Sequence, residues 1–357
     1  MHSLSTNAMS HFTHNPLLVS ILFILPWISS CTKDPVDQPE GNGDPVDTLP
    51  EYSILPHTDW EQYANNPVLQ PTENEGDWDE NMTSAPFVIL LRDTLRMWYE
   101  GSTSVKLDGV IQIGYAWSLD GIEWNRLDAP VLEAIPDSWA YPHMASPVVL
   151  EDGDTLRMWF GGGDYTSVGM VIGYAASLDG IHWTRHDAPV ISRTKDWNTG
   201  GVLPGPVMKE DGVYKMWFTG GTGHVGYPNS STSWSTGYAT SEDGVQWTVN
   251  DEPVLEHGMN AEFDENSALA GSVIRSDTLY EMWYSGFRGI GQGSSIGVAV
   301  SEDGIKWEKY EGNPVMNKSL ISDALYNPRV IIFEGGYQMW YSAWHPGPTI
   351  HHAIAIN

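Results

Sequence analysis

The chain has 357 residues, and its 46 Asp and Glu residues outnumber its 17 Lys and Arg residues, which gives a formal net charge of −29. A surface this acidic repels phosphate backbones, so the composition argues against a nucleic-acid partner. The single cysteine, Cys31, excludes an intramolecular disulfide.

The N-terminal segment has the features of an export signal. Residues 17–27 form an apolar stretch that is too short for a comfortable membrane-spanning helix. The following Ile28-Ser29-Ser30-Cys31 resembles a bacterial lipobox, in which the cysteine becomes the lipidated first residue after signal cleavage. We therefore expect residues 1–30 to be a lipoprotein signal peptide and the mature protein to be lipid-anchored through Cys31 in the bacterial cell envelope, periplasmic or surface-exposed. An ordinary secretory signal with a chance cysteine is the alternative.

The next segment, residues 31–55, is predicted to be a flexible acidic tether. It is rich in Asp, Pro and Gly and has hardly any aliphatic residues between positions 32 and 50. The membrane would then be contacted only through the N-terminal lipid.

The remainder of the chain repeats one phrase roughly every sixty residues. Each copy contains a Met-Trp-aromatic strand, and most copies add a Ser-x-Asp-Gly-x-x-Trp turn and a Pro-Val-aliphatic strand. The segments are rich in Val, Ile, Tyr, Trp and Thr and lack helical periodicity, which indicates short β-strands. In the first copy we expect strands near residues 85–91, 95–100, 111–118 and 124–132. The Met-Trp pairs begin at Met97, Met158, Met216, Met282 and Met339, and the turns begin at Ser118, Ser177, Ser241 and Ser301.

The region contains five Met-Trp strands but only four Asp-Gly turns, and its N-terminal end accounts for the difference. Trp60 leads to Asn66-Pro67-Val68 with the same step that takes Trp307 to Asn313-Pro314-Val315. The N-terminal strand therefore occupies the place of the missing outer strand in the last copy. The prediction is an all-β fold over residues 56–357, a five-bladed β-propeller closed by the N-terminal strand, which completes the C-terminal blade.

Repeated residues are expected to be scaffold, because one substrate in a central funnel meets each blade in a different role. The candidate site therefore lies in the loops that differ between copies. Carboxylates, His and Arg among aromatic rings suit sugars, since rings stack on the apolar sugar face and polar groups bind hydroxyls. The catalytic candidates are Asp79, Glu80, Asp264 and Glu265, two aromatic-Asp-Glu-Asn segments found only in the first and fourth copies; solvated loop charge is the alternative. The candidate substrate-binding residues are Trp78, Glu100, Trp139, His143, Asp164, Trp197, His224, Arg288, Asp323 and His345.

The repeats, with phrases such as the Gly-Tyr-Ala-x-Ser-x-Asp-Gly-x-x-Trp of residues 114–124 and 237–247, resemble the five-bladed glycoside hydrolase superfamily that includes families 43, 32 and 130. The resemblance implies the architecture more specifically than the reaction. Family 43 places a catalytic Asp directly before the Pro that opens the innermost strand, but no carboxylate occupies the matching positions here. The family 32 signatures are absent as well. The matching positions are Ala85, Ser146, Gly205, Gly271 and Asn327.

Two functions from different classes follow. The first is a glycoside hydrolase, or a related glycan-cleaving enzyme, that acts on plant or algal polysaccharide fragments with Asp79 and Glu265 as the leading acid and base. The second is a surface carbohydrate-binding lipoprotein without catalysis; a sialidase-like propeller is a weaker third possibility. We expect an oligo- or polysaccharide partner, no cofactor, no metal and a monomer.

Overall fold

The computed structural model describes residues 57–72, 74–105, 108–165, 169–223, 233–259, 261–276, 278–289, 292–317, 324–344 and 347–356. The chain separates into two units, residues 1–53 and 54–357, and the fold below is that of the second. The predicted signal peptide, tether and lipidation site at Cys31 lie outside the described residues and stay predictions. Of the candidate binding residues, His224, Asp323 and His345 also lie outside them. No helix within the described residues is long and apolar enough to span a membrane.

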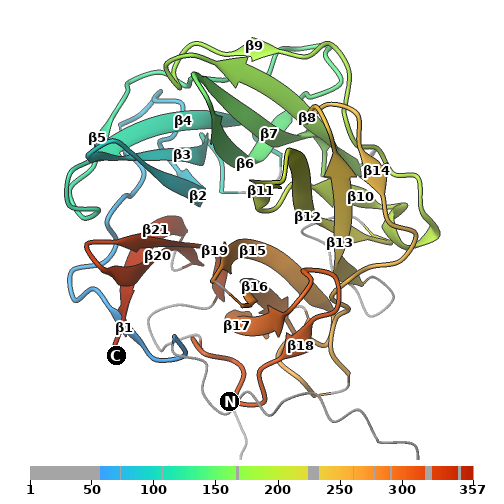
Figure 1. The fold of residues 1–357 in the computed structure, drawn as a ribbon. Helices are drawn as coiled ribbons and strands as arrows, with labels where there is room; N and C mark the ends of the chain where they lie inside the picture. The colour runs from blue at the N-terminus through green and yellow to red at the C-terminus, as the bar shows by residue number, and fades with distance from the viewer. Residues whose placement is uncertain are drawn as a thin grey trace, which may run out of the picture. The chain divides into compact units, whose positions relative to one another are not determined.

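The second unit is all-β, as predicted, and its strands form three hydrogen-bonded sheets (Figure 1). Two of these sheets contain one parallel contact each, β4–β6 and β13–β15, which divides the strands into five antiparallel groups. We call these groups repeats 1 to 5. Repeat 1 contains β2 (Met82–Leu91), β3 (Thr94–Ser102), β4 (Ile111–Ser118) and β5 (Asn125–Arg126). Repeat 2 contains β6 (His143–Asp152), β7 (Thr155–Asp164), β8 (Gly169–Ser177) and β9 (Thr184–Arg185). Repeat 3 contains β10 (Gly201–Leu203), β11 (Val207–Glu210), β12 (Val213–Gly221), β13 (Trp234–Ser241) and β14 (Thr248–Val249).

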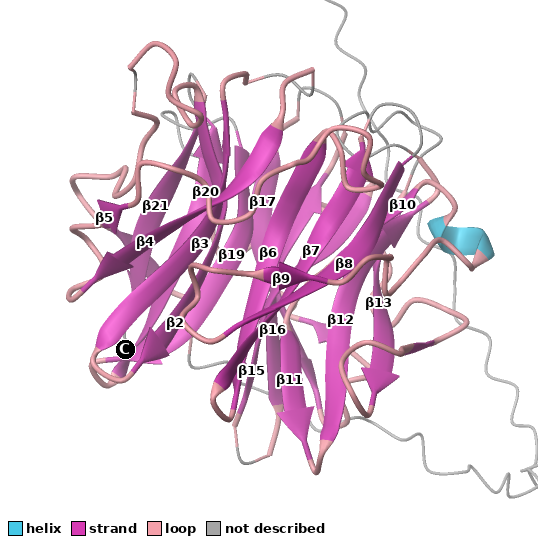
Figure 2. Cartoon of the chain, turned by 90° about the horizontal axis from the view of Figure 1, so that it is seen from above, coloured by secondary structure: helices cyan, strands magenta, loops and turns pink. Residues whose placement is uncertain are grey.

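Repeats 4 and 5 complete the unit. Repeat 4 contains β15 (Ser267–Arg275), β16 (Tyr280–Phe287), β17 (Ser294–Ser301) and β18 (Glu308–Lys309). Repeat 5 contains β19 (Ala324–Phe333), β20 (Gly336–Trp344), β21 (Pro348–Ala355) and β1 (Trp60–Gln62). Figure 2 shows most strands running in similar directions, with loops gathered at their ends and one short helix, η1 (Asp196–Asn198), among the described residues. The innermost strands contact one another in succession: β15 with β19, β19 with β2, β2 with β6, and β6 with β11.

The N-terminal strand pairs with the C-terminal strand, as the sequence predicts. In the β1–β21 pair, Trp60 lies opposite Ala355. Asn66 then holds β21 through its side chain, which accepts a hydrogen bond from the His352 N–H at 2.8 Å and donates to the His352 carbonyl at 2.9 Å. In repeat 4, Asn313 forms the same pair of bonds with Val298, at 2.8 and 2.9 Å. The two Asn-Pro-Val segments therefore have equivalent structural roles.

Deleting residues 57–70 is expected to destabilise the whole unit. The deletion removes the β1 ladder and the buried Leu69, and it exposes the edge of β21. Loss of one buried Leu alone costs about 3 kcal/mol, which corresponds to roughly 5 to 10 °C in Tm for a unit of this size. A thermal melt of the full chain and of this deletion measures the effect, with deletion of residues 32–50 as a control that should leave Tm unchanged. Equal Tm values for the 57–70 deletion and the full chain would contradict the role of β1.

Tryptophans tie each repeat to the next. The Trp of each Met-Trp pair meets the outer Trp of the following repeat edge-on, with ring centroids 5.9 to 6.2 Å apart. Repeat 5 is tied to repeat 1 in this way by Trp340 and Trp124, and repeat 4 to repeat 5 by Trp283 and Trp60. The Met-Trp indole N–H also donates to a turn glycine carbonyl of the following repeat in four of the five contacts: Trp98 to Gly180, Trp159 to Gly244, Trp217 to Gly304 and Trp340 to Gly121.

The Asp-Gly turns are scaffold, which confirms the interpretation of the repeated residues. In the first turn, Asp120 accepts the backbone N–H groups of Ile122 and Glu123, and Gly121 adopts a positive φ of 77°. The other three turns repeat this pattern. Repeat 5 has His57 where the turns have glycine, and the indole N–H groups of Trp60 and Trp283 have no hydrogen-bond partner among the described residues.

Candidate functional site

Three of the five junctions between repeats share one polar contact among the described residues. Where the first strand of a repeat bulges, a backbone N–H donates to a side chain on the second strand of the preceding repeat. The bulged residues adopt positive φ angles of 45 to 51°, which are uncommon outside glycine. The three bonds run from Ala85 to Ser342 (2.8 Å), from Ser146 to Glu100 (2.6 Å) and from Asn327 to Ser285 (2.9 Å).

Glu100 is the one carboxylate at this junction position. The position falls three residues after the Met of each Met-Trp pair, and the other four copies have Gly161, Thr219, Ser285 and Ser342. The Glu100 side chain comes from β3, lies between repeats 1 and 2, and is only 7% exposed. Burial raises the pKa of its carboxyl to about 7, although the hydrogen bonds from Ser146 act in the opposite direction. Glu100 therefore keeps a proton up to about neutral pH, which a general acid requires.

Several hydroxyl groups lie near Glu100: the Ser146 hydroxyl contacts its carboxyl at 3.4 Å, and Ser84 is its partner across the strand pair. The Tyr165 phenol interacts with the Ser146 side chain. Burial raises the pKa values of both Tyr165 and Tyr326, and the negative charge of Glu100 adds to the rise. Ser84 donates to the Tyr326 hydroxyl at 3.4 Å and lies 3.3 Å from the Ser342 hydroxyl. The first strands of repeats 1 and 5 and the second strand of repeat 5 therefore contribute hydroxyls to one cluster. We call Glu100, Ser84, Ser146, Tyr165, Tyr326 and Ser342 the junction cluster.

Two further candidate binding residues adjoin the junction cluster. His143 is buried, and its Nδ1 accepts the Tyr165 backbone N–H at 3.2 Å. Its ring also lies 4.9 Å from the Tyr165 ring. Asp164 ends β7 and directly precedes Tyr165. The structure thus brings together Glu100 and His143 through Tyr165, with Asp164 adjacent in sequence.

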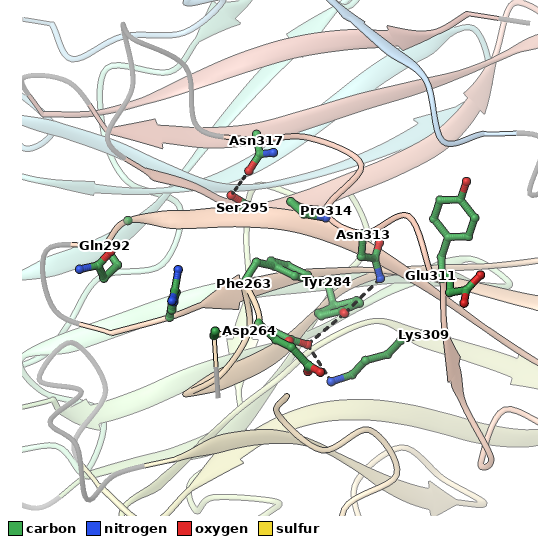
Figure 3. A pocket seen from close by; sticks show the side chains of 15 residues that line it. Phe263, Asp264, Tyr284, Gln292, Ser295, Lys309, Glu311, Asn313, Pro314 and Asn317 are labelled. Atoms are coloured by element: carbon green, nitrogen blue, oxygen red, sulfur yellow. Dashed lines mark hydrogen bonds and ion pairs between the residues drawn. The ribbon is translucent and has the colours of Figure 1, made fainter. Parts of the chain in front are cut away.

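The two predicted catalytic aspartates occupy equivalent ion pairs in separate repeats. Asp79 is 1% exposed and accepts hydrogen bonds from the Tyr99 hydroxyl and the Arg126 guanidinium, both at 3.0 Å. Asp264 is equally buried and accepts the Tyr284 hydroxyl at 3.0 Å and the Lys309 ammonium at 2.7 Å (Figure 3). Each aspartate thus links the second strand and the outer strand of its own repeat.

The neighbouring glutamates lie in the same loops. Glu80 accepts the Gly76 N–H at 2.5 Å and the Asn81 amide at 3.2 Å. Glu265 accepts the Ala261 N–H at 3.0 Å and lies 3.7 Å from the Arg288 guanidinium. The catalytic role of these four carboxylates stays a prediction, and the contacts they form are those of loop and strand anchors.

The aromatic residue before the first strand fits a slot between two glycines in four repeats. In repeat 1, a Cβ added to Gly101 or Gly114 would lie only 2.2 or 2.6 Å from the Trp78 ring. Trp139 packs on Phe160, and its indole N–H donates to the Asp187 carbonyl at 2.9 Å. Trp197 packs on Phe218 and donates to the Asp251 carbonyl at 2.8 Å. These candidate sugar-stacking residues therefore hold the second, third and outer strands of their repeats together.

Comparison with known proteins supports the fold. A family model for the glycosyl hydrolases family 32 N-terminal domain matches residues 203–347. Two uncharacterized proteins of Mycobacterium tuberculosis, Rv1502 of strain H37Rv and MT1551 of strain CDC 1551, are each 31% identical over 191 residues, which is 51% of this chain and 58% of theirs. The chain thus matches a little over half the length of these curated relatives.

Several solved structures share the architecture. A glycosyl hydrolase from Bacteroides ovatus is 19% identical with a TM-score of 0.68 over 83% of this chain and 94% of that one. A structure from the GH130 family of mannoside phosphorylases, described as containing glycoside hydrolases that target β-1,2 mannosidic linkages in Candida mannan, is 17% identical with a TM-score of 0.69 over 85% and 98%. A β-1,2-mannobiose phosphorylase from Listeria innocua is 15% identical with a TM-score of 0.64 over 83% and 96%. The unit therefore has the propeller fold found among glycoside hydrolases.

Proposed function

We propose that the chain is a glycan-cleaving enzyme built on a five-bladed β-propeller that β1 closes, with its active site at the junction cluster. The succession of five repeats, the contact of Trp340 with Trp124 and the β1–β21 pair support the closed ring. The solved glycoside hydrolases and phosphorylases of similar fold support an action on glycans.

The observation that carries the proposal is Glu100, a buried carboxyl at a position where the other four repeats have small or hydroxyl side chains. Its protonated form would donate to the glycosidic oxygen as the bond to the anomeric carbon breaks. The hydroxyls of Tyr165, Tyr326 and Ser84 would bind sugar hydroxyls. Water then adds to the anomeric carbon and releases a proton that replaces the one lost by Glu100, which gives hydrolysis. Phosphate that adds in place of water gives a sugar 1-phosphate.

Product analysis tests this proposal. The full chain is incubated with mannan-, xylan-, arabinan- and fructan-derived oligosaccharides, each with and without inorganic phosphate. Release of a shorter reducing sugar is expected for hydrolysis, and release of a sugar 1-phosphate for phosphorolysis. Binding of an oligosaccharide without any cleavage would overturn the proposal of an enzyme and support a carbohydrate-binding protein without catalysis. The absence of a carboxylate at Ala85, Ser146 and Asn327 favours this alternative.

A further inference from the structure

Repeat 4 contains a cavity of about 630 Å³ that is separate from the junction cluster. Figure 3 shows Phe263, Tyr284, Asn313 and Lys309 around it, with Asp264 beneath. Its volume lies within the range of small-ligand sites, roughly 300 to 1,000 Å³. Its lining combines aromatic rings with amide and charged side chains, so it has the composition of a binding site.

The cavity exists because repeat 4 departs from its sister repeats at two positions. Repeats 1 to 3 have Trp78, Trp139 and Trp197 where repeat 4 has Phe263. In repeats 2 and 3 the indole of this Trp fills the space, and its N–H donates to a backbone carbonyl of the outer loop. The acceptors are Asp187 and Asp251, each four residues after the Trp of the Asp-Gly turn. The residue at that place in repeat 4 is Glu311, which lines the cavity.

The outer loop of repeat 4 is also longer. Pro314 follows Trp307 by seven positions, whereas Pro189 follows Trp183 and Pro253 follows Trp247 by six. The smaller phenyl ring and the extra loop residue together open the cavity. Both glycines of the aromatic slot are kept, since a Cβ on Gly286 or Gly297 would lie 2.3 or 2.5 Å from Phe263. A tryptophan would therefore fit this slot as it does in the sister repeats.

Hydrogen bonds fix the floor of the cavity in place. Lys309 and the Tyr284 hydroxyl both donate to Asp264, and the Asn313 amide donates to Tyr284 at 3.3 Å. The side-chain oxygen of Asn317 accepts from Ser295 at 3.1 Å, and its side-chain N–H groups form no hydrogen bond with the part of the chain that the structure describes. An ordered set of amide, ammonium and phenol groups beside a ring is suited to hydroxyl-rich ligands.

The charges of the lining argue against an anion. The carboxylates are Glu262, Asp264 and Glu311, and the cations are Arg288 and Lys309. Lys309 is neutralised by Asp264 at 2.7 Å, and Arg288 lies 3.7 Å from Glu265. An acidic sugar or a phosphate would meet an excess of carboxylate, so the lining favours a neutral ligand.

We propose that this cavity is a second glycan-binding site, specific for neutral oligosaccharides, which holds a polysaccharide chain while the junction cluster cleaves it. The binding step does not depend on the identity of the catalytic group, so it can be tested apart from the proposed function.

The test replaces Phe263 with the tryptophan of the sister repeats. Titration calorimetry with mannan-, xylan- and arabinan-derived tetrasaccharides is performed on Glu100→Gln protein, in which the sugars are not consumed. We expect binding at two sites in this background and at one site after Phe263→Trp is added. Trigalacturonate, an anionic probe, is expected to bind the repeat 4 site at least tenfold more weakly than the neutral sugars.

Two controls keep the result specific. Trp197→Phe makes the reverse substitution in repeat 3 and should leave both sites intact, and Asn317→Ala should weaken the repeat 4 site about fivefold to tenfold without filling it. Phe263→Trp in otherwise unchanged protein should keep turnover of a short oligosaccharide within about twofold, because the junction cluster is untouched. The same number of sites with and without Phe263→Trp, including no binding in either, would overturn the proposal, as would tighter binding of trigalacturonate there.

Discussion

Glu100→Gln is expected to lower turnover by about 100-fold to 10,000-fold, the contribution typical of a general acid. Glutamine keeps an oxygen that can accept the Ser146 N–H, so the junction between repeats 1 and 2 is preserved, but it cannot donate a proton to the glycosidic oxygen. Turnover of the oligosaccharide that the wild type cleaves measures the effect, and a melt of each protein controls for folding. Turnover within tenfold of wild type would show that Glu100 is not the general acid.

The same variant is expected to be more stable than the wild type at alkaline pH. The pKa of Glu100 is raised from 4.5 to about 7 in the folded protein, so the folded state holds a proton that the unfolded chain has released between these values. The contribution of Glu100 to the free energy of unfolding is therefore fully present below pH 4.5 and is lost as the pH rises through 7. At pH 8 the buried charge costs up to about 3 kcal/mol, which glutamine avoids. Melts at pH 4.5 and pH 8 should show a stabilisation only at pH 8, and a Gln variant that is less stable than wild type at pH 8 would contradict the burial of a charge.

Asp79→Ala and Asp264→Ala are each expected to cost about 1 to 3 kcal/mol of stability, because each leaves a partly exposed cation and a buried tyrosine hydroxyl without their acceptor. Turnover per folded molecule should change little. Denaturant melts and activity assays on the soluble fraction measure the two quantities. The double variant Asp79→Leu/Arg126→Met removes both charges and should recover part of the loss.

The opposite outcome would support the catalytic role predicted from the sequence. If Asp79→Ala lowers turnover by several orders of magnitude while its melt stays that of the wild type, the aspartate is catalytic and its pairing with Arg126 serves the reaction.

The strands of the fold could be predicted because the repeated phrase marks each of them. The expected strands at 85–91, 95–100 and 111–118 correspond to β2, β3 and β4 within three residues. The expected strand at 124–132 shrinks to β5 and an isolated bridge between Ile113 and Leu132. The pairing of Trp60 with the C-terminal strand followed from the match between its surroundings and those of Trp307, because equivalent sequence fills an equivalent place.

The candidate site was harder to predict because side-chain direction is not visible in a loop sequence. The Asp-Glu pairs occur only in repeats 1 and 4, and in both repeats the aspartate has a tyrosine and a cation as partners. These partners are Tyr99 and Arg126 in repeat 1, and Tyr284 and Lys309 in repeat 4. This local pairing offers a structural explanation for the aspartates, and their catalytic role stays a prediction.

The junction cluster depends on contacts between repeats that no single repeat reveals. Comparing the third residue after each Met of the Met-Trp pairs would have isolated Glu100 as an acid among Gly and hydroxyl residues. Tyr165, Tyr326, Ser84, Ser146 and Ser342 gave no such signal, because they meet only when repeats 1, 2 and 5 pack together.

The pH dependence of kcat/KM tests the role of Glu100 most directly, because this profile reports the ionisation of essential groups in the free enzyme. For the oligosaccharide that the wild type cleaves, kcat/KM should decline as the pH rises through about 7, where Glu100 loses its proton. A kcat/KM that instead rises through pH 7, or stays constant to pH 9, would show that the reaction does not use a protonated Glu100.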